Sequence, residues 1–136
     1  MTYTDLPLED ATAASIAPFG ELLGVGCGRT TVRTRFYDDA VELVEKAPFV
    51  SDADTCLSIA RVRPRPCEVT WMERHFKHTQ VFLPLNRVPF AVVLAPPTPS
   101  GRLPELASAR AFRFAGDCGL MMHLGTPIRE LADLVH

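Results

Sequence analysis

The chain has 136 residues, of which 47% are hydrophobic and 22% are charged, and its formal net charge is −2. This length and balance predict one domain, spanning residues 1–136, with room for an apolar core. The sequence has no Lys/Arg block of the kind that contacts nucleic acid or a membrane surface, and no apolar run approaches the roughly 20 residues that cross a bilayer.

The N-terminal part predicts a strand, a short helix and a second strand. Residues 1–5 lack the basic start and apolar stretch of a signal peptide, so a cytoplasmic protein is expected. Residues 6–9 suit an extended piece, and residues 11–16 suit a helix that Pro18-Phe19-Gly20 ends. Residues 21–25 form a short apolar run.

Three glycines, Gly24, Gly26 and Gly28, predict a flexible turn after this run. A dinucleotide-binding loop needs a helix after its glycines and one more glycine at a fixed spacing. Residues 29–36 are strand-like instead, so a phosphate-binding loop is not expected.

The rest of the chain is typical of short strands separated by proline, glycine and asparagine turns. Strands are predicted, in chain order, at residues 55–62, 67–75, 79–84, 90–95, 111–115 and 119–124, while residues 37–43 fit a strand or a short helix. Short helical turns are predicted at residues 103–109 and 131–135. This pattern indicates an all-β fold, an antiparallel barrel or sandwich.

The four cysteines, Cys27, Cys56, Cys67 and Cys118, contain no CxxC spacing. In a cytoplasmic protein they are expected to be small apolar side chains with free thiols, because that compartment keeps thiols reduced. A zinc site built from them is not expected.

Residues 71–85 carry the densest polar chemistry of the chain. Alternation puts Glu73 and His75 on one face of a strand and Arg74 on the other. His78 and Gln80 share a face of the next strand, and pairing of the two strands across residues 76–77 would bring these groups together.

Three positions, Lys77, His78 and His123, also have plainer interpretations. Lys77 and His78 are predicted to form a solvated turn, since such residues are mostly exposed. His123 lies in the apolar run of residues 119–124, where it needs a hydrogen-bond partner if it is buried. Alone, His123 is better explained as a satisfied core histidine than as a ligand, but together with His75 and Gln80 it indicates a pocket.

The order of these motifs resembles the cupin barrel and, more specifically, the ureidoglycolate lyase family. Glu73-Arg74-His75, residues 79–85 (TQVFLPL) and the apolar run at residues 89–95 are similar to the ERH, TQxFxPL and following strand of that family. Weaker similarities are Pro18-Phe19-Gly20, residues 109–112 (ARAF) and residues 119–126 (GLMMHLGT).

The resemblance implies a cupin-like antiparallel β-barrel or jelly roll, a homodimer, and cleavage of ureidoglycolate into glyoxylate and urea during allantoin and purine breakdown. It implies catalytic roles for His75, His123, Gln80 and Glu73, with Arg74 and Gln80 binding the substrate. It also implies a divalent metal (nickel, zinc or manganese), for which His75 and His123 are the expected ligands.

The residue types suit this reaction. Ureidoglycolate is a carbinolamide that bears a carboxylate, so its cleavage needs a base for the hydroxyl proton and an acid for the departing urea nitrogen. Neutral histidine is a suitable base near pH 7, and arginine matches a carboxylate.

The sequence departs from the family after Gly125-Thr126, where a Trp-His pair is the family pattern and Pro127-Ile128-Arg129 stands here. A barrel that is incomplete at this end is therefore expected, with an uncovered edge that a partner chain can pair with. The same departure keeps an alternative open: a diverged, non-catalytic cupin that binds a small carboxylate, or a lyase that acts on a related 2-hydroxy acid derivative.

Overall fold

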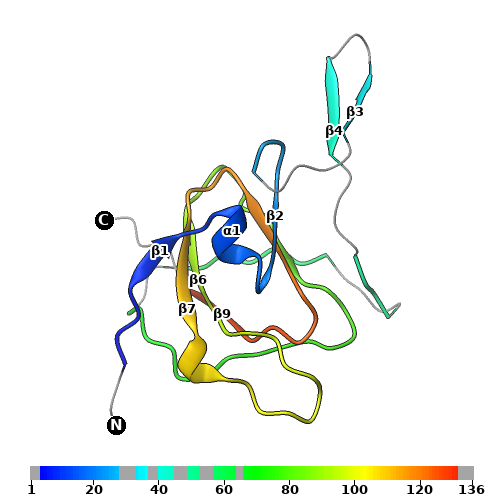
Figure 1. The fold of residues 1–136 in the computed structure, drawn as a ribbon. Helices are drawn as coiled ribbons and strands as arrows, with labels where there is room; N and C mark the ends of the chain where they lie inside the picture. Colours follow the sequence, from blue (N-terminus) through cyan, green and yellow to red (C-terminus); the bar gives the residue numbers. More distant parts are fainter. Residues whose placement is uncertain are drawn as a thin grey trace.

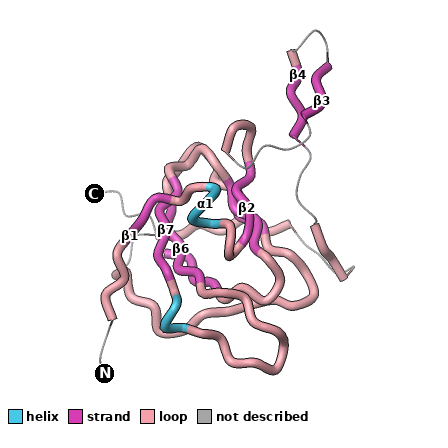
Figure 2. The backbone as a smooth tube through the Cα atoms, in the orientation of Figure 1, coloured by secondary structure: helices cyan, strands magenta, loops and turns pink. Residues whose placement is uncertain are grey.

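The computed structural model describes residues 4–27, 33–36, 40–44, 49–52, 57–63 and 66–131. Its elements are, in chain order, β1 (Leu8–Asp10), α1 (Ala13–Ile16), β2 (Gly20–Leu23), β3 (Arg33–Phe36), β4 (Val41–Val44), β5 (Val81–Phe82), β6 (Phe90–Leu94), the 3-10 helix η1 (Leu106–Ser108), β7 (Arg110–Phe114), β8 (Gly119–Met122) and β9 (Ile128–Leu131). Figure 2 shows how much of the chain between these elements runs as loop. None of the described helices is long and apolar enough to cross a membrane.

Strands distant in the sequence form two main sheets. One has the order β1-β7-β6-β9, and the other has the order β2-β8-β5. All pairings within them are antiparallel except β1 with β7, which is parallel. The β3–β4 hairpin pairs with itself and projects away from both sheets (Figure 1). The expected all-β, cupin-like class is confirmed, as two sheets rather than a closed barrel among the described strands.

The main core lies between the two sheets. The four-stranded sheet contributes Val92 and Leu94 from β6, and the three-stranded sheet contributes Leu120 and Met122 from β8. The other face of β6, with Ala91 and Val93, packs on a second cluster formed with segment 66–72 and β7. Because both faces of β6 are covered, its apolar run is uninterrupted, and its predicted burial is confirmed.

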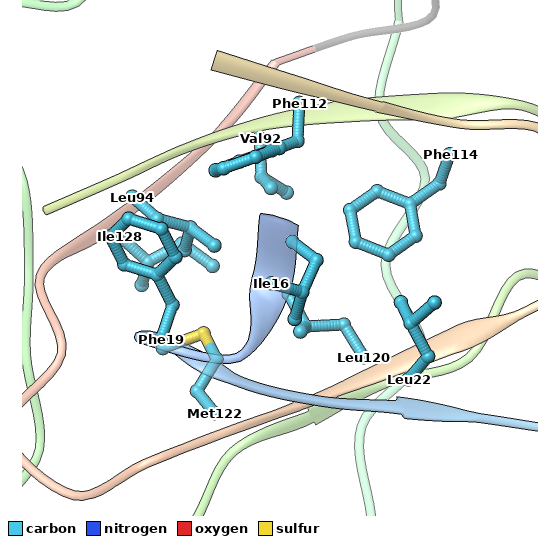
Figure 3. Close-up of a cluster of buried hydrophobic side chains, with 10 residues drawn as sticks. All are labelled: Ile16, Phe19, Leu22, Val92, Leu94, Phe112, Phe114, Leu120, Met122 and Ile128. Atoms are coloured by element: carbon cyan, nitrogen blue, oxygen red, sulfur yellow. The ribbon is translucent and has the colours of Figure 1, made fainter. Parts of the chain in front are cut away.

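The short helix α1 places one side chain in the centre of this core. Thr12 caps it, because its hydroxyl accepts the Ser15 N–H while the Ser15 hydroxyl accepts the Thr12 N–H. Ile16 at its end is fully buried, with side chains of both sheets around it (Figure 3). The space between the sheets is therefore filled with apolar side chains.

Two predicted strands are wrong. Residues 57–62 form no ladder within the described chain, and Leu57 and Ile59 are 96% and 83% exposed. Of residues 67–75, only Glu73 makes a β-bridge, to Ile128. Alternation favours an extended backbone, but a strand also needs a neighbouring strand, and alternation does not encode one.

The prediction that all cysteines are free thiols is also wrong. Cys27 and Cys118 form a disulfide across 91 positions of sequence. The antiparallel pairing of β2 with β8 ends at Leu23 and Gly119, which brings the two cysteines together although their spacing gives no sign of it. Cys67 is free and exposed, and Cys56 lies outside the described residues.

The C-terminal edge differs from expectation as well. Residues 128–131 form β9, which pairs with β6 from Leu94↔Ile128 to Ala91↔Leu131, so the edge of β6 is covered. Leu131 is thus a strand residue rather than the start of a helix, and the remainder of that predicted helix, residues 132–135, lies outside the described residues.

Candidate functional site

Residues 73–82 and 120–128 run side by side in opposite directions. At one end Glu73 and Ile128 exchange two main-chain hydrogen bonds, of 3.0 and 2.8 Å. At the other end Phe82 pairs with Leu120 in the β5–β8 ladder. The densest polar stretch of the sequence therefore lies against the segment that carries His123.

The strand pairing in this arrangement differs from the predicted hairpin across residues 76–77. Residues on both sides of the bend at 76–78 pair with the same neighbouring segment instead of with each other. The Gly125 N–H donates to the His75 carbonyl at 2.7 Å, and the Met122 N–H donates to the Gln80 carbonyl at 2.9 Å.

His75 and His78 form an imidazole pair. Their ring centroids lie 4.5 Å apart with an interplanar angle of 31°, and both residues are half-buried. Lys77 between them is exposed, as predicted, but His78 is not the fully solvated turn residue that was expected. The sequence signal for the contact between His75 and His78 is their i, i+3 spacing, because a bend at that spacing can bring the two rings together.

Gln80 is held opposite Met122 in continuation of the β5–β8 register. Alternation gives it the same face as Phe82, which packs against the main core. Its side-chain Oε1 is buried and accepts no hydrogen bond from the described residues. Such an acceptor is unfavourable unless a donor reaches it, which makes it a candidate ligand-binding atom.

His123 follows directly after β8 and is exposed. Its main-chain N–H donates to the Phe19 carbonyl at 2.8 Å, and the buried Thr126 hydroxyl donates to the same carbonyl at 3.2 Å. The interpretation of His123 as a buried core histidine is therefore wrong. The turn at 123–126 is fixed by its backbone and by Thr126, which leaves the imidazole facing solvent.

Glu73 and Arg74 lie at the far end of the polar stretch. Glu73 is exposed, and its described contacts are the main-chain bonds to Ile128. The Arg74 guanidinium donates to the Thr98 hydroxyl at 2.6 Å and to the Arg102 carbonyl at 2.9 Å. These bonds engage two of the five guanidinium donors in holding the loop at residues 98–102.

The predicted metal ligands do not form a three-ligand centre. Among the described residues, His75 and His123 belong to no group of three His, Cys, Asp or Glu side chains whose ligand atoms lie within 4.8 Å of one another. Within the described part of the chain the one such group is Cys27, Asp117 and Cys118, and its two sulfur atoms are joined in the disulfide. The donor set at His75 and His123 thus does not fit a typical protein-bound transition-metal ion.

Comparison with known proteins gives one consistent family. A family model described as ureidoglycolate lyase matches residues 4–127. A protein named ureidoglycolate lyase from Azotobacter vinelandii is 32% identical over 135 residues, which cover 94% of this chain and 79% of that protein. Proteins of the same name from Pseudomonas syringae pv. tomato and Brucella melitensis are each 32% identical, over 88% of this chain and 71% and 70% of their own length.

Proposed function

The chain belongs to the ureidoglycolate lyase family, and from that membership we propose that it cleaves ureidoglycolate into glyoxylate and urea. Two observations support the proposal: the match covers nearly the whole described chain, and the TQxFxPL stretch lies beside the histidine-bearing turn. In this reading residues 1–136 act as one cupin-like lyase domain of purine and allantoin breakdown.

The reaction moves one proton off an oxygen and one onto a nitrogen. A base takes the hydroxyl proton of ureidoglycolate, the oxygen electron pair forms the aldehyde carbonyl, and the C–N bond breaks. An acid protonates the departing nitrogen, so that glyoxylate and urea leave. The site must supply these two proton-transfer groups and a contact for the ureido group.

We assign the base to His75. It is half-buried, and its neighbour His78 restricts how its ring turns. Neutral imidazole is the side chain best suited to accept a proton near pH 7. His123, on the adjacent turn, is the proposed acid, and Glu73 is a second proton-carrying group at the end of the same segment.

Gln80 is the proposed contact for the ureido group, and its geometry is the observation that carries the assignment. Its buried Oε1 has no donor among the described residues, and a ureido group presents N–H donors. Binding would therefore pair an atom that is otherwise costly to bury. Arg74 would hold the substrate carboxylate with donors that the 98–102 loop leaves free.

The test incubates the purified chain with ureidoglycolate and measures glyoxylate against the spontaneous rate. We expect glyoxylate above that background, and its loss in the His75→Ala variant with retention in the Lys77→Ala variant. Background rates for the unaltered chain would contradict the lyase assignment and favour a small-carboxylate binding protein. Adding nickel, zinc or manganese after chelator treatment tests the divalent metal that the family resemblance implies.

A homodimer is part of the same proposal. Leu57 and Ile59 are exposed on a segment whose alternation suits a strand but which pairs with no described strand, and an unpaired strand pairs readily with a second chain. Sedimentation velocity should find a dimer, and the Leu57→Glu/Ile59→Glu variant should shift it to monomer, while Leu103→Glu, also on an exposed residue, should leave it unchanged. A monomeric wild-type chain would exclude this interface.

The expected cytoplasmic location is a proposal too, and the disulfide bears on it. Stable disulfides are typical of oxidising compartments, whereas in a cytoplasm they are usually reversible. A cytoplasmic location therefore implies that the Cys27–Cys118 bond opens and closes. Cell fractionation, with an assay of the thiol state in the lysate, tests both points.

A further inference from the structure

The end of β8 opposite His123 carries a second cluster of reactive side chains, formed by Cys27, Asp117 and Cys118. Their two sulfur atoms and a carboxylate oxygen all lie within 4.8 Å of one another. We propose that reduction of the disulfide turns this cluster into a binding site for a thiophilic divalent metal, with zinc the best match. The site is separate from the residues proposed for catalysis.

The loop that carries Cys27 holds the sulfur atom of this residue close to the turn that carries Asp117. Gly24 has φ +152°, and a Cβ at that position would lie 2.7 Å from the Cys27 Sγ. The Cys27 N–H donates to the Gly24 carbonyl at 3.2 Å, and its Sγ lies 3.7 Å from the Asp117 carbonyl oxygen. Only glycine fits at position 24 without moving the sulfur.

The turn that carries Asp117 and Cys118 is fixed in the same manner. Gly116 has φ +100°, and a Cβ there would lie 2.2 Å from the Arg87 carbonyl oxygen. The β2–β8 ladder ends at Leu23 and Gly119, close to both halves of the cluster. The Cys27 N–H bond to the Gly24 carbonyl, the packing of Gly116 and the β2–β8 ladder do not depend on the S–S bond, so we expect the two thiols to stay neighbours after reduction.

The ligand types suit zinc. Zinc binds thiolate sulfur at about 2.3 Å and carboxylate oxygen at about 2.0–2.2 Å, so two ligands of one ion lie no more than about 4.6 Å apart. The two sulfur atoms, which are bonded to each other in the oxidised form, must move apart to ligate one ion, and the Asp117 carboxylate oxygen lies within 4.8 Å of both. Three protein ligands leave the fourth tetrahedral position to water.

The conversion balances in electrons and protons. A dithiol reductant gives two electrons and two protons to the disulfide, which yields two thiols and the oxidised reductant. Zinc then replaces the two thiol protons, which are released. Re-formation of the disulfide by an oxidised dithiol passes two electrons to that oxidant, which takes up two protons from solvent, and frees the metal. Asp117 is exposed and both cysteines are half-buried, so reductant and metal can reach them.

The experiment uses the full chain carrying Cys56→Ser and Cys67→Ser, so that Cys27 and Cys118 are the remaining thiols. Oxidised and phosphine-reduced samples are dialysed against zinc, and the bound metal is measured by competition with a chromophoric chelator. The reduced form should bind about one zinc and the oxidised form none. Equal zinc binding by the two forms would overturn the proposal.

Two variants locate the ligands. Asp117→Asn should weaken zinc binding by the reduced chain at least about tenfold, whereas His75→Ala/His78→Ala should leave it unchanged. The reverse pattern would place the metal at the histidines and refute the assignment. Cobalt in place of zinc gives a thiolate charge-transfer absorption, which should appear in the reduced form and vanish on oxidation. Absence of that band would show that the sulfurs are not ligands.

Discussion

The Met122 N–H donates to the Gln80 carbonyl at 2.9 Å, and this bond joins the two halves of the proposed site. It fixes Gln80 against β8 at the point where the strand ends and the His123 turn begins. His75 and His78, whose ring centroids lie 4.5 Å apart, precede Gln80 on the same segment.

The first prediction concerns that imidazole pair. His75→Ala should lower kcat/KM by about 10²–10⁴-fold, because it removes the proposed base. His78→Ala should have a smaller effect on kcat, because His78 orients the ring of His75 rather than contacting the reacting atoms. Steady-state glyoxylate production checks both. Lys77→Ala is the matched control, since Lys77 lies between them and is exposed. Equal losses in all three variants would show that the bend, not the imidazoles, matters.

The second prediction separates stability from function at Gln80. Gln80→Leu removes a buried acceptor that no described donor satisfies, so the free energy of unfolding should rise by about 1 kcal/mol. The same change should raise KM about three- to tenfold, because the proposed ureido contact is lost. Urea denaturation and steady-state kinetics give the two values. A destabilised variant with unchanged KM would mean that Gln80 is structural.

Sequence patterns predicted the parts of the fold that depend on local chemistry. The uninterrupted apolar run of β6 gave its burial, and the Pro18-Phe19-Gly20 stop gave the end of α1. The patterns failed where the answer depends on a distant partner. Alternation at residues 57–62 has no strand beside it in the described chain, and Cys27 meets Cys118 only through the β2–β8 pairing.

The site shows the same division between local and distant information. The order of the sequence motifs identified His75, Gln80 and His123 as candidate pocket residues. The structure places their backbones on neighbouring segments. The exposure of His123 and the contact between His75 and His78 depend on how the turns at 123–126 and 76–78 bend, and the i, i+3 spacing of the two histidines permits that contact without fixing it.

The third prediction tests the core between the sheets. Leu120 is fully buried between Leu22 on β2 and Phe82 on β5, its partners in the ladder. Leu120→Ala should lower the free energy of unfolding by about 2–5 kcal/mol, since it leaves a cavity in a packed interior. Leu103→Ala makes the same chemical change at a residue that is 85% exposed, so it should cost less than about 0.5 kcal/mol. Similar costs at both positions, measured by denaturant unfolding, would contradict this description of the core.

The last prediction concerns the ion pair that joins β1 to β7. The Arg110 guanidinium donates two hydrogen bonds to the Glu9 carboxylate, and this contact holds the pKa of Glu9 below its usual value of 4.5. A carboxylate whose pKa is lowered by folding stabilises the fold above its unfolded pKa. That contribution disappears as the pH falls through the lowered pKa.

Glu9→Gln should therefore be less stable than wild type at neutral pH, by a small margin because the pair is exposed to solvent. The difference should shrink below about pH 4.5 and vanish once the carboxylate is protonated. Thermal unfolding followed from neutral to acid pH measures the curve, and Arg110→Gln, which removes the same pair from the other side, should reproduce it. A Glu9→Gln difference that stays constant with pH would show that the contact acts through packing rather than charge.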